Sequence, residues 1–242
     1  QALMFENYDF RYEKQYRLAQ EGALRQIQAG LSSPGNESIE YFLMAGMKGL
    51  EAIHVMRRGE FVAAIGNGLD AVKALSESVK AAPDFVDPKL GDGMYMYWRT
   101  VVARASPLIP DGPDERAAGK ELMKKVEREG VLLSPAATLS LAYSYIEDRD
   151  LRNALARTMY GRTKYPNNVI NNMTAGRVLT SMRRYDDAVR MYKDVLAAAP
   201  DNQRANYHLG VVYSRMSKYP EAEKAFSTYI AYKDVTPEYR GQ

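Results

Sequence analysis

The stretch LGVVYSRMSKYPEAEKAF, Leu209–Phe226, decides the fold of this chain, because its pattern of small and large residues recurs at intervals of 34 residues. Small, apolar or aromatic residues stand at corresponding places three times, and a proline twice: Leu141, Ala175 and Leu209; Ala142, Gly176 and Gly210; Tyr145, Leu179 and Tyr213; Ala154, Ala188 and Ala222; Thr158, Tyr192 and Phe226; Pro166 and Pro200. A fixed period of this length is typical of a repeat protein, in which each unit stacks on the next.

Each 34-residue unit is predicted to be a pair of helices. In the middle unit, residues 168–182 carry apolar and small side chains at helical spacing, the polar segment SMRRYDD interrupts them, and residues 188–199 resume the pattern. Gly176 and Ala188 are small where the paired helices must approach closely, and Tyr192 is large enough to fill the space beside them. Pro200 cannot continue a helix and marks the end of the unit.

These residues resemble the tetratricopeptide repeat family, in a form expected of a bacterial protein. The third unit matches the family pattern best, at Leu209, Gly210, Tyr213, Ala222 and Phe226. The second unit has Ala175 where the family has a leucine and Leu179 where it has a tyrosine. The first unit has Ala142 at the glycine position and Thr158 at the aromatic one. The resemblance covers residues 134–234 and implies an all-α fold, a right-handed superhelical solenoid of helix pairs.

The upstream half follows the same pattern more loosely. We predict a long helix over about residues 5–30, with apolar side chains from Phe5 onward at steps of three and four, and two longer helix pairs at 41–56 with 61–80 and 87–104 with 116–130. Asn36 or Ser38 is expected to cap the first of these helices, and Asp114 to cap the last. The chain should thus hold about eleven helices in one continuous domain, with residues 1–133 divergent, 134–234 regular and 235–242 starting a further helix or tail.

The composition excludes several classes of protein. The chain has 242 residues, no cysteine and a formal net charge of +3, which excludes disulfides and thiolate metal sites. Its lysines and arginines are scattered, unlike those of a nucleic-acid binder, and no apolar run approaches the roughly 18 to 20 residues that span a bilayer. Because the sequence begins at Gln1 and Thr236–Glu238 has the pattern of a helix start, we expect it to be a fragment of a longer chain. The compartment, cytoplasm or periplasm, is therefore left open.

One stretch has the composition of a ligand site: GDGMYMYW, residues 91–98, with two glycines, two tyrosines and the only tryptophan. A phosphate-binding loop would need its glycines between a strand and a helix, with a Lys or Ser/Thr in register. Neither the strand nor the lysine is present, so we favour aromatic side chains packed between helices and keep a ligand platform as the alternative.

No other motif indicates catalysis or a cofactor. His54 and His208 are the only histidines and lie 154 residues apart, so a metal site is not expected. We interpret His54 as a packing residue and His208 as a surface or groove residue. The acidic loop PDGPDER, residues 110–116, lacks the ligand spacing of a calcium loop. We therefore expect neither an enzyme nor a bound metal or cofactor.

Function is expected on the surface. The inner wall of such a stack is lined by the first helix of each pair, and by resemblance its inward positions form a candidate groove of Tyr143, Ile170, Met173, Arg177, Arg204, Tyr207, Val211 and Arg215. This mixture of aromatic, apolar and basic residues suits an extended or helical peptide with acidic character. The alternative is that these residues are simply solvated or packed against one another.

The preferred function is a non-catalytic adaptor or scaffold that holds a protein or peptide partner in this groove. A second class is a self-associating structural subunit, a homo-oligomer formed through the helix at residues 222–232, which would expose Phe226, Tyr229 and Ile230 if nothing covers it. A third is an exported factor of bacterial envelope assembly, which the resemblance and the lack of cysteine allow. The sequence does not identify the partner.

Overall fold

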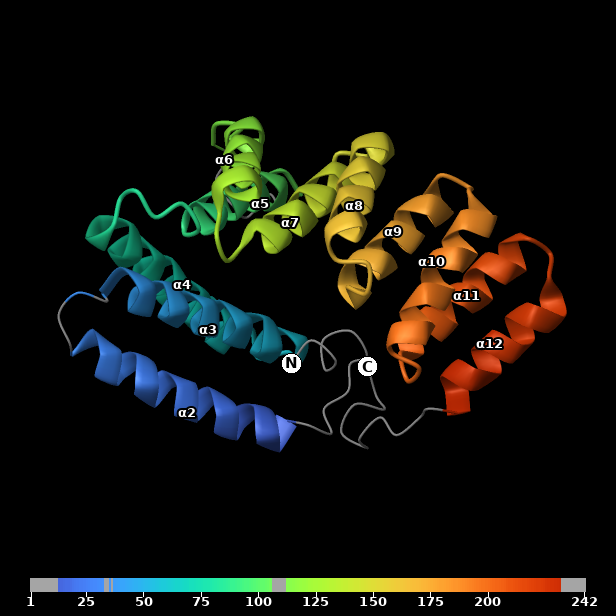
Figure 1. The fold of residues 1–242 in the computed structure, drawn as a ribbon, viewed down its shortest axis with the longest axis horizontal. Helices are drawn as coiled ribbons and strands as arrows, with labels where there is room; N and C mark the ends of the chain where they lie inside the picture. Colours follow the sequence, from blue (N-terminus) through green and yellow to red (C-terminus); the bar gives the residue numbers. More distant parts are fainter. Residues whose placement is uncertain (1–12, 33–34, 36, 106–111, 232–242) are drawn as a thin grey trace. The chain divides into compact units, whose positions relative to one another are not determined.

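The computed structural model describes residues 13–32, 35, 37–105 and 112–231 of the chain. These residues form eleven α-helices and no strand, so the predicted all-α fold of helix pairs is confirmed (Figure 1). By its internal contacts the chain divides into two compact units at Ser134–Pro135. We call described residues 13–134 the N-terminal unit and 135–231 the C-terminal unit, and describe each by itself.

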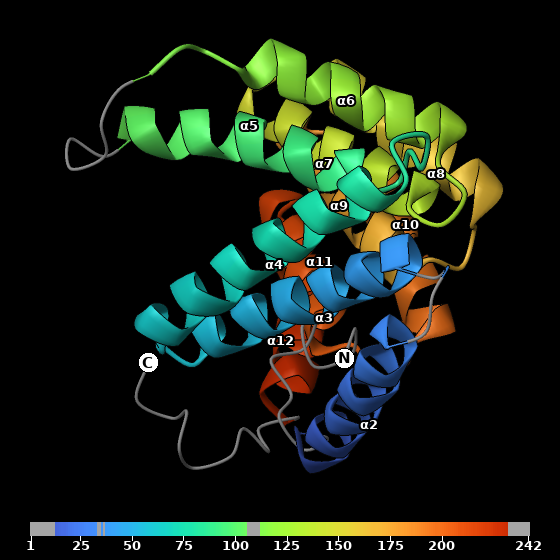
Figure 2. The same cartoon turned by 90° about the vertical axis from the view of Figure 1, so that its left-hand side faces the viewer.

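The N-terminal unit contains five helices: α2 (Glu13–Leu31), α3 (Glu37–Arg57), α4 (Phe61–Ala81), α5 (Lys89–Ala105) and α6 (Arg116–Glu129). Helix α3 packs on α2 and, antiparallel, on α4, while α5 pairs with α6 (Figure 2). These bounds agree closely with the predicted pairs. The described part of the first helix begins at Glu13, so the predicted contributions of Phe5, Tyr8 and Tyr12 lie outside the described residues.

The C-terminal unit contains the three 34-residue repeats: α7 (Ser134–Glu147, which starts at the junction) with α8 (Leu151–Lys164), α9 (Val169–Ser181) with α10 (Tyr185–Ala198), and α11 (Gln203–Arg215) with α12 (Tyr219–Ala231). From α8 to α12 each helix packs against the next. The segment that was expected to begin a further helix, residues 235–242, lies outside the described residues.

The small and large residues of the repeat meet as the sequence predicts. A Cβ atom added to Gly176 would lie 2.6 Å from a ring carbon of Tyr192, and one added to Gly210 would lie 2.6 Å from the corresponding carbon of Phe226. Each glycine therefore makes room for the aromatic side chain of its own pair. In the first repeat the corresponding residues, Ala142 and Thr158, are both smaller and fully buried.

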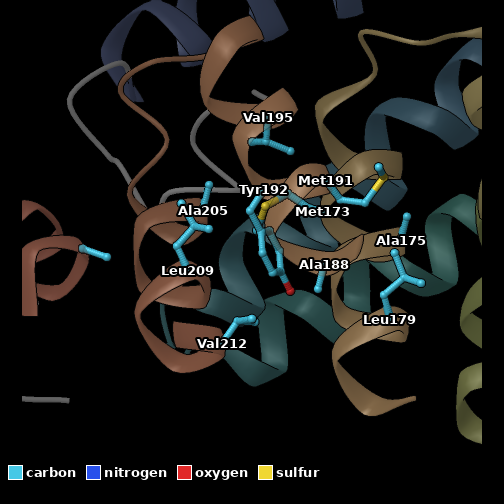
Figure 3. Close-up of a cluster of buried hydrophobic side chains, with 11 residues drawn as sticks. Met173, Ala175, Leu179, Ala188, Met191, Tyr192, Val195, Ala205, Leu209 and Val212 are labelled. Atoms are coloured by element: carbon cyan, nitrogen blue, oxygen red, sulfur yellow. The ribbon is translucent and has the colours of Figure 1, made fainter. Parts of the chain in front are cut away.

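One hydrophobic core runs through the second and third repeats, with the ring of Tyr192 among aliphatic side chains from neighbouring helices (Figure 3). Its buried members are Met173, Ala175, Leu179, Ala188, Met191, Tyr192, Val195, Ala205, Leu209, Val212 and Ala225. Because consecutive repeats share this core, each one stabilises its neighbour.

The turns inside the helix pairs also repeat, in a way that the sequence analysis did not anticipate. Arg149, Arg183 and Ser217, spaced 34 residues apart, adopt left-handed backbone conformations with φ of 59°, 59° and 58°. In each turn the next residue donates its N–H to a carbonyl of the first helix, from Arg184 to Leu179 at 2.9 Å for example. Glycine usually occupies such positions, and Gly59 does so between α3 and α4 with φ 82°.

One predicted helix cap, Asp114, is wrong, and of the two alternatives for α3, Ser38 is excluded. Ser38 lies inside α3, and its hydroxyl donates a 2.9 Å hydrogen bond to the carbonyl of Ser78 on α4, so it joins two helices instead of capping one. The alternative cap, Asn36, lies outside the described residues. Helix α6 begins after Glu115 and not after Asp114, and Glu115 makes no side-chain capping bond.

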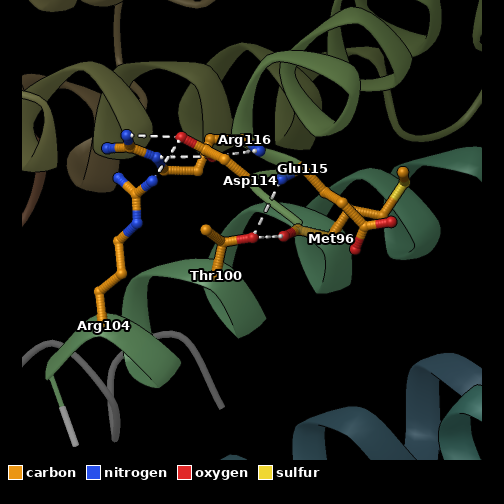
Figure 4. A network of polar contacts seen from close by, with 6 residues as sticks. All are labelled: Met96, Thr100, Arg104, Asp114, Glu115 and Arg116. Atoms are coloured by element: carbon orange, nitrogen blue, oxygen red, sulfur yellow. Dashed lines mark hydrogen bonds and ion pairs between the residues drawn. The ribbon is translucent and has the colours of Figure 1, made fainter. Parts of the chain in front are cut away.

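The acidic residues near the start of α6 fasten it to α5 (Figure 4). The carboxylate of Asp114 accepts the backbone N–H of Arg116 at 3.1 Å and pairs with the guanidinium groups of Arg104 and Arg116, each at 2.9 Å. The hydroxyl of Thr100 on α5 accepts the N–H of Glu115 at 3.2 Å. Hydrogen bonds from Arg116 hold the pKa of Asp114 well below its ordinary value, as expected of a structural ion pair.

Candidate protein-binding site

The stretch GDGMYMYW lies within α5, and its glycines serve packing. A Cβ atom on Gly93 would lie 2.7 Å from the carbonyl oxygen of Gly119, so the backbones of α5 and α6 touch where both residues are glycine. Tyr97 is fully buried, and Trp98 packs edge-on against it at 5.2 Å between ring centroids. The preferred interpretation, aromatic packing between helices, is confirmed for Tyr97, which lies against Gly119 of α6. Tyr95 stays exposed.

The two histidines occupy different environments. His54 is 1% exposed within α3, as expected of a packing residue. His208 is half-buried on α11, where its ring stacks on Tyr192 with centroids 5.4 Å apart and planes 9° from parallel. No cluster of three or more His, Asp or Glu side chains suited to a metal ion occurs in the part of the chain that the structure describes.

Three arginines converge on this stacked pair. Arg177 comes from α9, and Arg204 and Arg215 come from α11; we call them the arginine cluster. Burial raises the pKa of the Tyr192 hydroxyl to about 12, and a hydrogen bond with Thr180 and the positive charges of all three arginines oppose that rise. The positive charges of all three arginines therefore act on one hydroxyl group.

His208 experiences the same positive charge. Its pKa is lowered to about 4, first by burial and then by the charges of Arg204 and Arg177. Both effects disfavour the imidazolium form, so His208 is neutral at physiological pH. A neutral ring can stack on Tyr192 without adding a fourth positive charge to the cluster.

Among the described residues, two arginines of the cluster, Arg177 and Arg215, lack the acidic partners that other arginines of this unit have. Arg162 pairs with Asp194 at 2.7 Å, and Arg184 pairs with Asp187 at 2.6 Å. By contrast, the guanidinium groups of Arg177 and Arg215, both exposed, make no ion pair or hydrogen bond with any residue that the structure describes. An anionic group brought from outside would find charge there that the chain itself does not neutralise.

The other predicted groove residues differ from one another in exposure and in their neighbours. Tyr207 is 44% exposed and lies beside His208, Phe226 and Tyr229, with ring centroids 5.4 to 6.0 Å away. Ile170, Val211 and Tyr143 are half-buried, and the Tyr143 hydroxyl lies 3.3 Å from that of Thr174 on α9. Met173 is a correction: at 3% exposed it belongs to the core in Figure 3 and supports the surface from beneath.

A pocket in the N-terminal unit was missed by the sequence analysis. An apolar pocket of about 720 Å³ lies in the N-terminal unit among α2, α3, α4 and α5, lined by side chains such as Ile27, Phe42, Leu50, Leu75 and Met94. Apolar residues on neighbouring faces of four helices were visible in the sequence, but the space between them depends on how far apart the helices stand. Polar groups that could orient a small ligand are few in it.

Comparisons with known proteins agree with this fold. The family model described as "Tetratricopeptide repeat" matches residues 179–241, and no curated protein sequence matches the chain. Two crystal structures of MamA superpose with TM-scores of 0.54 and 0.53 at 20% and 19% identity, covering 72% and 85% of this chain and 93% and 97% of theirs. YrrB, described as a TPR protein with an unusual peptide-binding site, superposes with a TM-score of 0.52 at 15% identity, over 88% of this chain and 94% of its own.

The family model thus matches tetratricopeptide repeats over residues 179–241, and the solved structures share the all-α fold of stacked helix pairs. At these identities the structural likeness concerns the fold alone. Among the helices that the structure describes, none is long and apolar enough to cross a membrane.

Proposed function

We propose that this protein is a non-catalytic adaptor that holds an acidic segment of a partner protein against the arginine cluster. The observation that carries the proposal is that Arg177 and Arg215, both exposed, have no acidic partner among the described side chains, while their charges and that of Arg204 act on one buried tyrosine. Guanidinium groups bind carboxylates through forked hydrogen bonds. YrrB supports the proposal as a peptide binder of similar fold.

The surroundings of the cluster suit a peptide better than an isolated anion. Tyr207 offers an exposed aromatic face beside the arginines, and the half-buried Ile170 and Val211 add apolar surface on α9 and α11. Aromatic and arginine side chains dominate the affinity of many interfaces. The expected ligand is therefore a segment with carboxylates flanked by apolar or aromatic residues.

The test compares the wild type with the triple variant Arg177→Ala/Arg204→Ala/Arg215→Ala. Fluorescence anisotropy with labelled peptides that combine Glu or Asp with Leu or Phe should give binding to the wild type that weakens with salt. Loss of arginines that anchor an interface costs about 2 kcal/mol or more, so affinity should fall at least about thirtyfold. Native-lysate capture with the same proteins then identifies the natural partner.

A matched variant controls for lost charge. Arg152, Arg184 and Arg190 are exposed residues of the same unit, and changing all three to alanine removes the same charge away from the cluster. This variant should bind as the wild type does. Equal losses in both variants, or none in the first while it remains folded, would contradict the proposal.

The remaining alternative, an exported factor of bacterial envelope assembly, gains no specific support from the geometry and stays a prediction. Self-association is supported by a separate observation on the N-terminal unit.

A further inference from the structure

Helix α4 buries small residues and exposes large apolar ones, the reverse of what is expected of a helix in a folded unit. Its buried positions are Ala74 and Ser78, and the side chains turned away from α3 are large and apolar. The exposed fractions on this outer face are 65% for Phe61, 87% for Val62, 65% for Ile65, 66% for Leu69 and 47% for Val72. A helix that packed only inside this unit would show the opposite arrangement.

The outer face is also a regular seam. Phe61, Ile65, Gly68 and Val72 follow a spacing of four, three and four residues, with Val62 and Leu69 beside them. This spacing keeps the four positions on one stripe of an α-helix, as in pairs of helices that pack along their length. The acidic and basic residues of α4, among them Asp70 and Lys73, lie off this stripe.

Gly68, within the seam, packs closely against none of the residues that the structure describes. A Cβ added to Gly68 would meet no atom within 4 Å, whereas one added to Gly93, Gly176 or Gly210 would meet another helix or a ring at less than 3 Å. Glycine within a helix costs about 1 kcal/mol relative to alanine. The open space over Gly68 therefore indicates room for a side chain that the described chain does not supply.

We propose that α4 packs antiparallel against α4 of a second copy of this chain, about a two-fold axis between residues 66 and 67. The spacing of the four seam positions is the same from either end of the helix. Antiparallel packing of two α4 helices therefore places Ile65 of one copy over Gly68 of the other, and Phe61 over Val72. The large side chain of Ile65 thereby fills the open space over the glycine. This self-complementarity selects a second copy over an unrelated partner, because an isologous contact uses one patch twice.

The exposed area agrees with a dimer. The five large residues of the outer face present on the order of 500 Å² of apolar surface, at the upper end of what a monomer exposes. Leu43, Leu50 and Met94 are exposed beside the apolar pocket of the same unit. The outer face of α4 alone thus supplies more than half of the roughly 800 Å² per partner that a stable interface buries.

The dimer does not depend on the proposed acidic-peptide site, since α4 and the arginine cluster belong to different units. The first experiment is sedimentation velocity of the full chain over a range of concentrations, for the wild type, Ile65→Lys and Ile230→Lys. Ile230 is a matched control because it is 53% exposed on α12, the surface expected from the sequence to mediate self-association.

The wild type and Ile230→Lys should dimerise alike. In Ile65→Lys the dissociation constant of the dimer should rise at least about a hundredfold, since the lysine enters the symmetric contact twice. Circular dichroism verifies that both variants are folded. A wild type that stays monomeric, or a dimer lost in Ile230→Lys and kept in Ile65→Lys, would overturn the proposal.

The second experiment tests the register, using the absence of cysteine from the chain. Proteins carrying Ile65→Cys or Gly68→Cys are oxidised separately and as a mixture. Residues 65 and 68 face each other across the axis, whereas two copies of residue 65 are offset by about 4.5 Å along the helices, and disulfides require Cα atoms within about 7 Å. Crosslinking should be fastest in the mixture.

A control pair on the opposite side of α4, Asp70→Cys mixed with Glu77→Cys, should crosslink slowly. Crosslinking of the 65/68 mixture no faster than of this control would refute the register. Binding of wild-type monomers to neutral phosphatidylcholine vesicles, abolished by Ile65→Lys, would show instead that a lipid surface covers the seam and would overturn the dimer.

Discussion

The pKa of His208 is a property through which the charge of the arginine cluster can be measured. Its pKa of about 4 reflects burial and the charges of Arg204 and Arg177. A carboxylate bound at the cluster would offset those charges, so the pKa should rise toward the ordinary value as an acidic peptide is added. A titration of the imidazole resonances by NMR measures this, and the His208→Gln variant identifies the signal because the chain has two histidines.

The lowered pKa of His208 also predicts that the stability of the protein depends on pH. Between about pH 6.5 and pH 4 the unfolded chain binds a proton at His208 that the folded chain does not, so the free energy of unfolding should decrease as the pH falls through this window. We expect a loss on the order of 2 kcal/mol after allowance for solvent screening at a half-buried site. Urea unfolding at pH 7 and pH 5 should show a smaller decrease for His208→Gln; equal decreases would contradict the shift.

The turns within the helix pairs contain backbone conformations that lower the stability of the repeats. Arg183 and Ser217 hold left-handed conformations without being glycine, which costs roughly 1 kcal/mol per residue. Ser217→Gly should therefore raise the free energy of unfolding by about 0.5 to 1 kcal/mol, measured by urea denaturation. Gly59→Ala, at φ 82°, is the reverse substitution and should lower it by a similar amount; a destabilised Ser217→Gly would contradict this account of the turn.

The helices themselves show what could be predicted from pattern. Their bounds followed from apolar periodicity and from breakers such as Pro200. The inverted arrangement of α4 could not be predicted in this way, because periodicity reveals an apolar face without showing which neighbour covers it. The wrong cap at Ser38 has a related cause: its hydroxyl is used by Ser78, 40 residues away.

The two units suggest complementary roles for one protein: the C-terminal repeats hold a partner, and the N-terminal unit joins two copies. A dimer would then present two arginine clusters, and a partner with two acidic segments would bind more tightly than one with a single segment. Surface plasmon resonance should show slower dissociation from a densely coupled surface of acidic peptide than from a sparse one. Ile65→Lys should abolish that difference and leave the affinity for a free peptide unchanged; an unaltered difference would contradict the combined proposal.

The sequence by itself determined the repeat, the helix pairs and the fit of Gly176 to Tyr192 and of Gly210 to Phe226, because these depend on local periodicity and on contacts between adjacent helices. Only the tertiary structure decided which predicted groove residues offer surface. It buried Met173, gathered three arginines around Tyr192 and left the large residues of α4 exposed. Exposure and electrostatic environment depend on residues far apart in the chain, so a pattern with a period of 34 residues cannot specify them.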